Sequence, residues 1–123
     1  MSGQKRSVRG ADRLVRRLEW LRGGAEDRVP GALGETAEEV SEAAQAELRL
    51  MPGDLPHLAG TVDMEGEGRE RAVVVRHPAA PFIELGTRHM PPRPFLQRAA
   101  DRARTSLRKR IGEALVRLLR RRP

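Results

Sequence analysis

Apolar residues in the first half of the chain recur every three or four positions, which is the spacing of one face of an α-helix. The first periodic stretch predicts a helix over about residues 9–23, and Gly23 and Gly24 are typical residues at which a helix stops. A second helix is predicted from Pro30 to about residue 51, where Pro52 and Gly53 end it. The apolar positions of these two helices are Ala11, Leu14, Leu18, Leu21 and Ala25, and then Leu33, Ala37, Val40, Ala44, Leu48 and Met51.

From Leu58 the apolar period changes to two, which is typical of a β-strand. Val62 and Met64 face one way and alternate with polar residues. A flexible Glu-Gly-Glu-Gly turn follows at 65–68, and then the β-branched run Ala-Val-Val-Val at 72–75. The pattern predicts an antiparallel hairpin whose second strand is apolar enough to be covered on both faces.

A proline-rich segment separates the hairpin from the last helix. Residues 82–85 form an apolar run that suits either an edge strand or a tight turn of helix. Three prolines restrict the backbone after Gly86, so a stiff, extended loop is expected up to Pro94, which suits the first turn of a helix over about 94–120. The apolar stripe of that helix is Leu96, Ala100, Ala103, Leu107, Ile111, Leu115 and Leu118. The predicted fold class is therefore α+β, with N-terminal helices, a small antiparallel hairpin, the proline-rich loop and a long C-terminal helix.

Length and composition limit the size of the core. The chain has 123 residues, of which 38% are apolar and only three are aromatic, so we expect a single domain over 1–123 with short basic tails at 1–8 and 120–123. A core this lean favours an obligate assembly in which a neighbour covers further apolar surface. No apolar run is long enough for a membrane span, and the N-terminus is too charged for a secretory signal peptide.

Charge is distributed unevenly along the chain, whose net charge is +7. Residues 1–28 carry eight basic and four acidic groups, residues 29–56 one and six, and residues 93–123 eleven and two. Because 22 of the 24 basic residues are arginine, part of this excess reflects codon usage. The basic ends and the acidic middle suit contacts between copies of the chain.

Residues that could carry chemistry are scattered. There is no cysteine, which excludes disulfides and thiol catalysis, and His57, His77 and His89 match no metal-ligand spacing. The serines form no catalytic triad with a histidine and an aspartate, and residues 31–36 resemble a phosphate loop but lack its lysine. The acidic cluster Glu38, Glu39 and Glu42 is interpreted as the solvated face of a helix. We therefore predict no enzyme activity, no metal and no cofactor.

The basic C-terminal helix has three interpretations: a solvated face, a surface that follows DNA phosphates, or a helix on an anionic membrane. The membrane interpretation is the weakest because the helix lacks large aromatic anchors. Sequence-specific RNA binding is disfavoured because the chain has few aromatic residues on which bases could stack.

Residues 82–99 are the most specific stretch and read Phe-Ile-Glu-Leu-Gly-Thr-Arg-His-Met-Pro-Pro-Arg-Pro-Phe-Leu-Gln-Arg-Ala. They resemble the signature of the neck or tail-completion proteins of tailed phages, the gene-product-ten-like family of lambdoid siphophages. That signature begins with an aromatic residue, an aliphatic residue, Glu, a second aromatic residue and Gly-Thr. After a short spacer it continues with Met-Pro, Pro-Phe-Leu and Ala. Leu85 stands where the family often has an aromatic residue. The order of predicted elements agrees over about residues 30–120.

The resemblance implies a structural virion protein that is assembled in the bacterial cytoplasm and forms a homo-oligomeric ring, of six subunits in the family, at the head-tail junction. Its implied partners are a head-closure or connector protein on one side and the tail tube or tail terminator protein on the other. Contacts with other subunits or partners are expected at Glu84, Gly86, Thr87, Arg88, Met90, Arg93 and Phe95. Contacts with packaged DNA or an acidic partner are expected at Arg102, Arg108 and Arg117. Gly86 is expected to have positive φ, and Phe95 with Leu96 to pin the loop into the core.

Two other functions stay open on the sequence. The alternative is a small basic bacterial protein that binds nucleic acid without sequence preference and needs no ring. A toxin-like nuclease of similar length is disfavoured because no His, Glu or Tyr set converges in the sequence. Native mass or imaging of the assembled particle separates the ring from a monomer.

Overall fold

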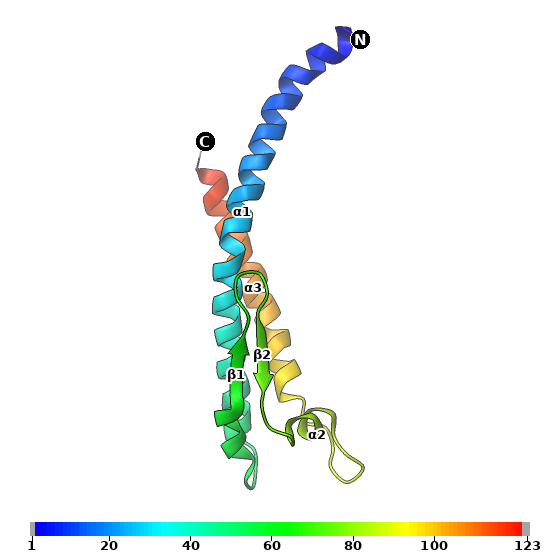
Figure 1. Cartoon of the computed structure of the whole chain (residues 1–123), viewed down its shortest axis with the longest axis vertical. Coiled ribbons are helices and arrows are strands. Elements are labelled where there is room, and N and C mark those ends of the chain that lie inside the picture. The colour runs from blue at the N-terminus through cyan, green and yellow to red at the C-terminus, as the bar shows by residue number, and fades with distance from the viewer. Residues whose placement is uncertain (1, 122–123) are drawn as a thin grey trace.

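The long helix α1 runs the length of an elongated molecule, and α3 packs antiparallel along part of it (Figure 1). The computed structural model describes residues 2–121, with side chains for residues 10–121. The hairpin lies along the helices with its turn near the middle of the molecule, and α2 lies at the end where α1 ends and α3 begins (Figure 1). The elements in chain order are α1 (Ser2–Arg49), the 3-10 helix η1 (Leu55–Thr61), β1 (Val62–Glu65), β2 (Ala72–Val75), α2 (Ala80–Leu85) and α3 (Phe95–Arg120). This arrangement confirms the predicted α+β class.

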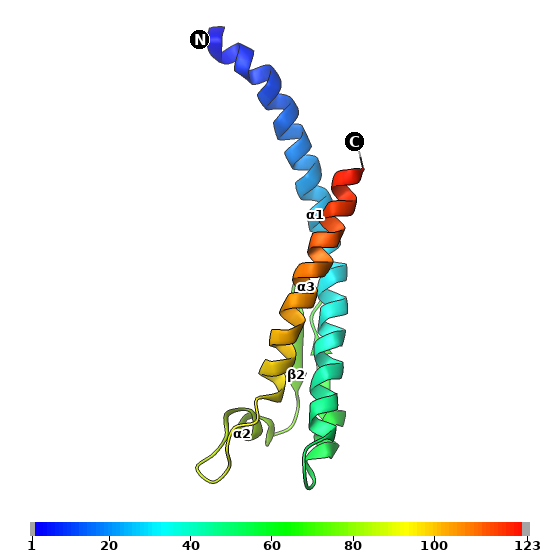
Figure 2. The ribbon, with the colours of Figure 1, turned by 180° about the vertical axis from the view of Figure 1, so that it is seen from behind.

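The two predicted N-terminal helices are one continuous helix of 48 residues, so the predicted break at Gly23, Gly24 and Pro30 is wrong. Pro30 lies inside α1, where it removes one backbone hydrogen bond at a cost of about 3 kcal/mol. Packing of α1 along α3 offsets that cost, and both views show the helix curving rather than ending (Figures 1 and 2).

Gly24 does not end the helix but provides space for packing against α3. A Cβ atom at Gly24 would lie 2.7 Å from Cδ2 of Leu118, so the missing side chain makes room for the end of α3. Directly after Gly24, Ala25 and Val29 line a small cavity together with Ile111 of α3. The glycine that periodicity alone assigned to a helix end therefore marks a close contact between the two long helices.

The hairpin forms as predicted, but its first strand is shorter. β1 pairs with β2 in antiparallel register, with Val62 opposite Val75 and Met64 opposite Val73. Residues 58–61 were expected in the strand and belong to η1 instead, where the Thr61 hydroxyl donates to the Leu58 carbonyl (2.6 Å).

The hairpin packs against the core through one face only. Val62, Val73 and Val75 contact the core. Asp63 lies on the opposite face, where Arg76 Nε donates to Asp63 Oδ2 (3.1 Å). The Met64 amide and then Arg76 lower the pKa of Asp63. The core covers one face of β2, and Val74 on the other face is partly buried as well.

The core is a single cluster near the junction of α1, η1, α2 and α3. Its largest fully buried side chains are Phe95, Leu48, Leu58 and Ile83. Alanines fill the contact between the long helices, so the core is as thin as the composition predicted. In the expected N-terminal tail, residues 2–8 are helical. In the expected C-terminal tail, Arg120 is the last residue of α3, and residues 122–123 lie outside the described residues.

Candidate partner-binding site

The segment between α2 and α3 closes on itself instead of running extended, which corrects the sequence prediction. Gly86 has φ +77°, and a Cβ there would lie 2.7 Å from the Pro92 nitrogen. The Thr87 amide donates to the Met90 carbonyl (2.8 Å), and the Met90 amide donates back to Thr87 (3.3 Å). The measured angle confirms the expected positive φ of Gly86. The absence of a side chain at Gly86 also lets the two sides of the loop approach closely.

Both ends of this loop are fixed to the body. The Arg93 amide donates to the Ile83 carbonyl (2.8 Å), which joins the loop to α2. Met90 packs against the core, and the Phe95 side chain is only 1% exposed. The prediction that Phe95 pins the loop is therefore confirmed, with Leu96 partly buried against the same core.

Glu84 connects α2 to the start of α3. Its Oε2 accepts a hydrogen bond from the Leu96 amide (3.0 Å), and its Oε1 accepts one from the Gln97 amide (2.9 Å). These amides are among the first N–H groups of α3, which have no partner within the helix. The carboxylate also lies at the positive end of the helix dipole. Glu84 is thus a helix cap, a role that its distance of twelve residues from Leu96 hides in the sequence.

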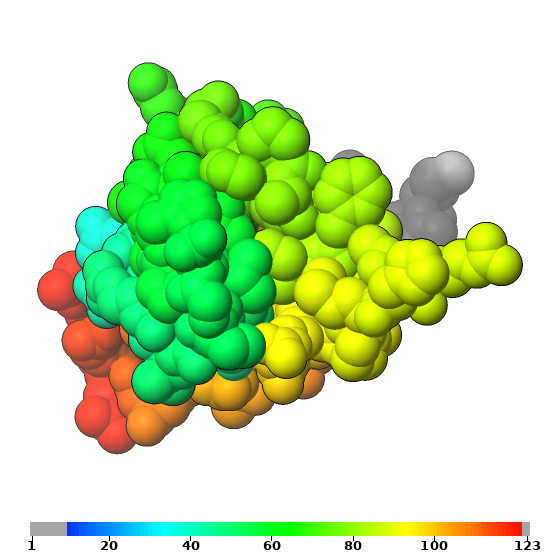
Figure 3. Space-filling view, turned by 90° about the horizontal axis from the view of Figure 1, so that it is seen from below, coloured from blue at the N-terminus to red at the C-terminus, as the bar shows by residue number. Residues whose placement is uncertain are grey.

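The loop leaves a defined surface open to solvent. Thr87, Arg88 and His89 are exposed around its turn, and the loop projects beyond the helices at this end of the molecule (Figures 1 and 3). On the adjoining helix α2, the side chains of Phe82 and Leu85 are 58% and 77% exposed. A cationic turn and two bare apolar side chains therefore lie close together on a segment whose backbone is already ordered.

The structure divides the seven predicted interface residues into two groups. Thr87 and Arg88 are exposed and available to a partner, and Arg93 is partly exposed. The other four have structural positions: Glu84 caps α3, Gly86 permits the close turn, Met90 packs on the core and Phe95 is buried in it.

A groove of about 470 Å³ lies between the end of α1 and the start of α3, and three arginines line it. Arg98 Nη2 lies 3.2 Å from Glu47 Oε2, and Arg102 Nη2 lies 3.0 Å from Glu47 Oε1. The Glu47 side chain is only 15% exposed, and Arg93 lines the same groove. Three guanidinium groups around one carboxylate leave an excess of positive charge. Glu47 was not predicted as a site residue from the sequence, because its partners lie about fifty residues away.

The three arginines predicted to meet DNA differ in their surroundings. Arg102 is held by Glu47 in the groove, so part of its charge is already neutralised. Arg108 and Arg117 are exposed and form no ion pair with another described residue. Among these three, Arg108 and Arg117 are the better candidates for contacts with phosphate.

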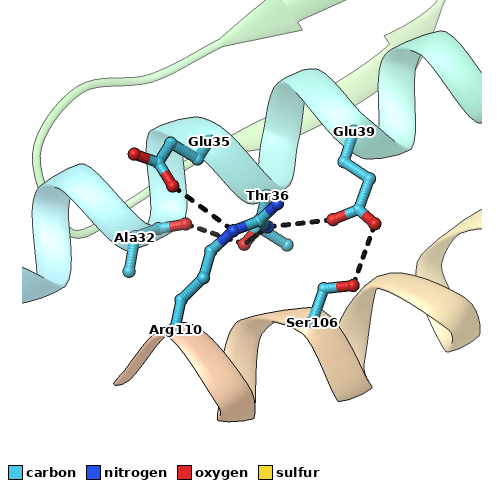
Figure 4. A network of polar contacts seen from close by, with 6 residues as sticks. All are labelled: Ala32, Glu35, Thr36, Glu39, Ser106 and Arg110. Atoms are coloured by element: carbon cyan, nitrogen blue, oxygen red, sulfur yellow. Dashed lines mark hydrogen bonds and ion pairs between the residues drawn. The ribbon is translucent and has the colours of Figure 1, made fainter. Parts of the chain in front are cut away.

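Arg110, a basic residue of α3, belongs to a network between the long helices (Figure 4). Its Nη1 donates to Thr36 Oγ1 (2.8 Å) and to Glu39 Oε2 (2.9 Å), and Nε lies 3.3 Å from Glu35 Oε2. Ser106 Oγ donates to Glu39 Oε1 (2.9 Å). The Ser106 hydroxyl, and then Arg110, lower the pKa of Glu39.

This network qualifies the interpretation of the acidic part of α1 as a solvated face. Glu39 is only partly exposed and is paired with Ser106 and Arg110, whereas Glu38 and Glu42 are exposed as predicted. Residues 31–36, which resembled a phosphate loop, lie within α1. Within that segment the Thr36 hydroxyl donates to the Ala32 carbonyl (2.7 Å).

His57 and His77 lie edge to face, with ring centroids 5.5 Å apart. Over residues 2–121, no group of three or more metal-ligating side chains gathers around them or elsewhere. Within the same range no helix is both long enough and apolar enough to cross a bilayer.

Comparison with known proteins adds no relative to this picture. The chain matches no protein-family model, no curated protein and no solved structure.

Proposed function

We propose that this chain is a structural subunit of a tailed-phage virion, which forms a ring at the head-tail junction and joins the DNA-filled head to the tail. The observation that carries the proposal is the segment 82–99, which resembles the neck-protein signature and folds into one fixed unit. The loop is closed at Gly86, tied to Ile83 and anchored by Phe95. A partner that meets a surface already ordered loses little conformational entropy on binding.

The chemistry of this end of the molecule fits a protein partner. Phe82 and Leu85 offer exposed apolar contact area next to the cationic turn at Arg88. The arginine groove around Glu47 adds positive charge at the same end of α1 and α3. A partner with an acidic surface and an apolar centre, such as the neighbouring ring of a head or tail, is complementary to both features.

The proposal is tested in the phage that encodes the chain. Arg88→Glu reverses the charge of the exposed turn without touching the core, so we expect a folded subunit, full heads and separate tails. Arg69→Glu makes the same charge change in the distant hairpin turn and is expected to join heads to tails normally. Normal joining by Arg88→Glu particles would refute the assignment of the loop to the junction.

A second function has one observation in its favour. Arg108 and Arg117 are exposed cations on a long helix, which suits weak binding to duplex DNA without sequence preference. A ring subunit with a DNA channel and a monomeric DNA-binding protein share this property, and the native mass of the assembled protein separates them.

A further inference from the structure

The first part of α1 extends past the end of its helical partner. At 1.5 Å per residue the 48 residues of α1 span about 72 Å and the 26 residues of α3 about 39 Å. The two helices last approach each other where Leu118 meets Gly24, and α3 ends at Arg120. Residues 10–19, which we call the arm, are all exposed, and no other part of the described chain is packed along them (Figures 1 and 2).

The arm continues the apolar seam that α1 uses to bind α3. Leu14, Leu18, Leu21 and Ala25 follow each other at steps of four, three and four, which is the spacing of a helix-helix seam. Ala25 already packs at the α3 contact. Above it the seam is bare, with Leu14 57% exposed and Leu18 53% exposed.

The position of this seam points to another helix as its occupant. Val15, 49% exposed, lies beside Leu14 and Leu18 on this face, and Arg17 borders it. Because the seam lies in line with an existing helix pair, it presents the residues that a further helix would cover.

The same chain carries a surface of complementary chemistry. Glu38, Glu42, Ala46 and Leu50 form a ridge at i, i+4 spacing along α1, and all four are exposed. No described residue forms an ion pair with Glu38 or Glu42, and Leu50 is 86% exposed. This acidic ridge therefore offers two carboxylates and two apolar side chains to the arginines and leucines of an arm.

We propose that the arm of one subunit docks on the acidic ridge of a second copy of the chain, with Leu14 and Leu18 as its apolar contacts. Two arms would repel each other if they paired, because Arg13, Arg16 and Arg17 outnumber the acidic residues of the arm. Docking of an arm on a ridge is a heterologous contact, which generates a closed ring when its rotation closes. The inference rests on the proposed function only in that both require copies of the chain to associate.

The decisive measurement is the mass of the full chain in solution over a concentration series. Leu14→Ser with Leu18→Ser should shift the oligomer toward monomer and weaken self-association at least tenfold. The matched control, Asp12→Ser with Arg16→Ser, replaces the opposite face of the arm by the same number of serines at unchanged net charge. The control should keep the wild-type mass, and circular dichroism should show equal helix content in both variants.

A charge exchange identifies the ridge as the docking surface. Arg13→Glu with Arg17→Glu should weaken self-association, and so should Glu38→Arg with Glu42→Arg. Combining all four changes in one chain should restore much of it, because opposite charges again face each other across the contact. Failure of the combined variant to recover any association would refute the ridge as the site.

Two results would overturn the inference, and the first of them leaves the head-tail proposal standing. One is a seam variant with the wild-type oligomer mass. The other is a wild-type chain that stays monomeric but binds anionic vesicles or duplex DNA through Leu14 and Leu18. Conversely, Arg88→Glu is expected to keep the oligomer, so normal joining by that variant would count against the junction role alone.

Discussion

Replacing Glu84 by alanine removes both acceptors that hold the first turn of α3. Its carboxylate receives the Leu96 amide at 3.0 Å and the Gln97 amide at 2.9 Å. Loss of a helix N-cap costs about 0.5–2 kcal/mol, and a hydrogen bond to a charged group contributes about 1.5–3 kcal/mol. Because the site is partly exposed and water can replace one acceptor, we expect a loss of about 2 kcal/mol in the free energy of unfolding.

Glu84→Gln provides a graded comparison. The glutamine keeps one neutral carbonyl acceptor but loses the second acceptor and the charge, so about 1 kcal/mol is expected. For a chain of this length 2 kcal/mol corresponds to roughly 8 °C in Tm. Urea denaturation followed by circular dichroism measures both variants, at a protein concentration where they share the assembly state of the wild type.

Glu67→Ala in the hairpin turn is the matched control, because it removes one exposed carboxylate that forms no side-chain hydrogen bond with a described residue. It should change stability by less than about 0.5 kcal/mol. If Glu84→Ala were as stable as this control, the cap would contribute nothing and the link between α2 and α3 would rest on Phe95 alone.

Three further outcomes follow from the structure. Phe95→Ala should lower the free energy of unfolding by about 3–5 kcal/mol, because the ring is 1% exposed in the core, and an unchanged Tm would contradict that assignment. Binding to duplex DNA at low salt should collapse between about 50 and 200 mM salt. Arg108→Glu and Arg117→Glu should each weaken this binding more than Arg102→Glu does, because Arg102 is already paired with Glu47. A filter-binding assay measures the three variants, and equal losses of affinity would contradict this ranking. Because contacts with Ser106 and Arg110 lower the pKa of Glu39, its contribution to stability is complete above the ordinary pKa near 4.5 and is lost as pH falls through the lowered value. Glu39→Gln should therefore flatten the loss of stability in acid, which denaturation between pH 6 and about pH 3 measures.

Local pattern was enough for much of the fold. The period-two stretch, the glycine turn and the β-branched run predicted the hairpin, because strand alternation and turn chemistry act over a few residues. The final helix and the glycine at positive φ after residue 85 were predicted for the same reason. The buried position of Phe95 followed from its place between a proline and an apolar stripe.

Tertiary contacts decided what local pattern could not. Gly23, Gly24 and Pro30 signal helix ends in isolation, yet α1 continues through them because Leu118 and the rest of α3 pack against it. Residues 58–61 alternate like a strand but form part of a 3-10 helix, in which the Thr61 hydroxyl donates to the Leu58 carbonyl.

The candidate sites depend on the same distinction. Composition and the order of charges along the chain predicted a subunit that associates through basic ends and an acidic middle. The charge of each segment can be counted from the sequence without knowing the fold. Which charges remain free was settled only by folding: Glu84, Arg102 and Arg110 are engaged by residues that lie from twelve to about seventy positions away. The seam at Leu14 and Leu18 is likewise exposed only because α1 is longer than α3. The sequence pattern had predicted two shorter helices in place of α1, so it did not reveal this difference in length.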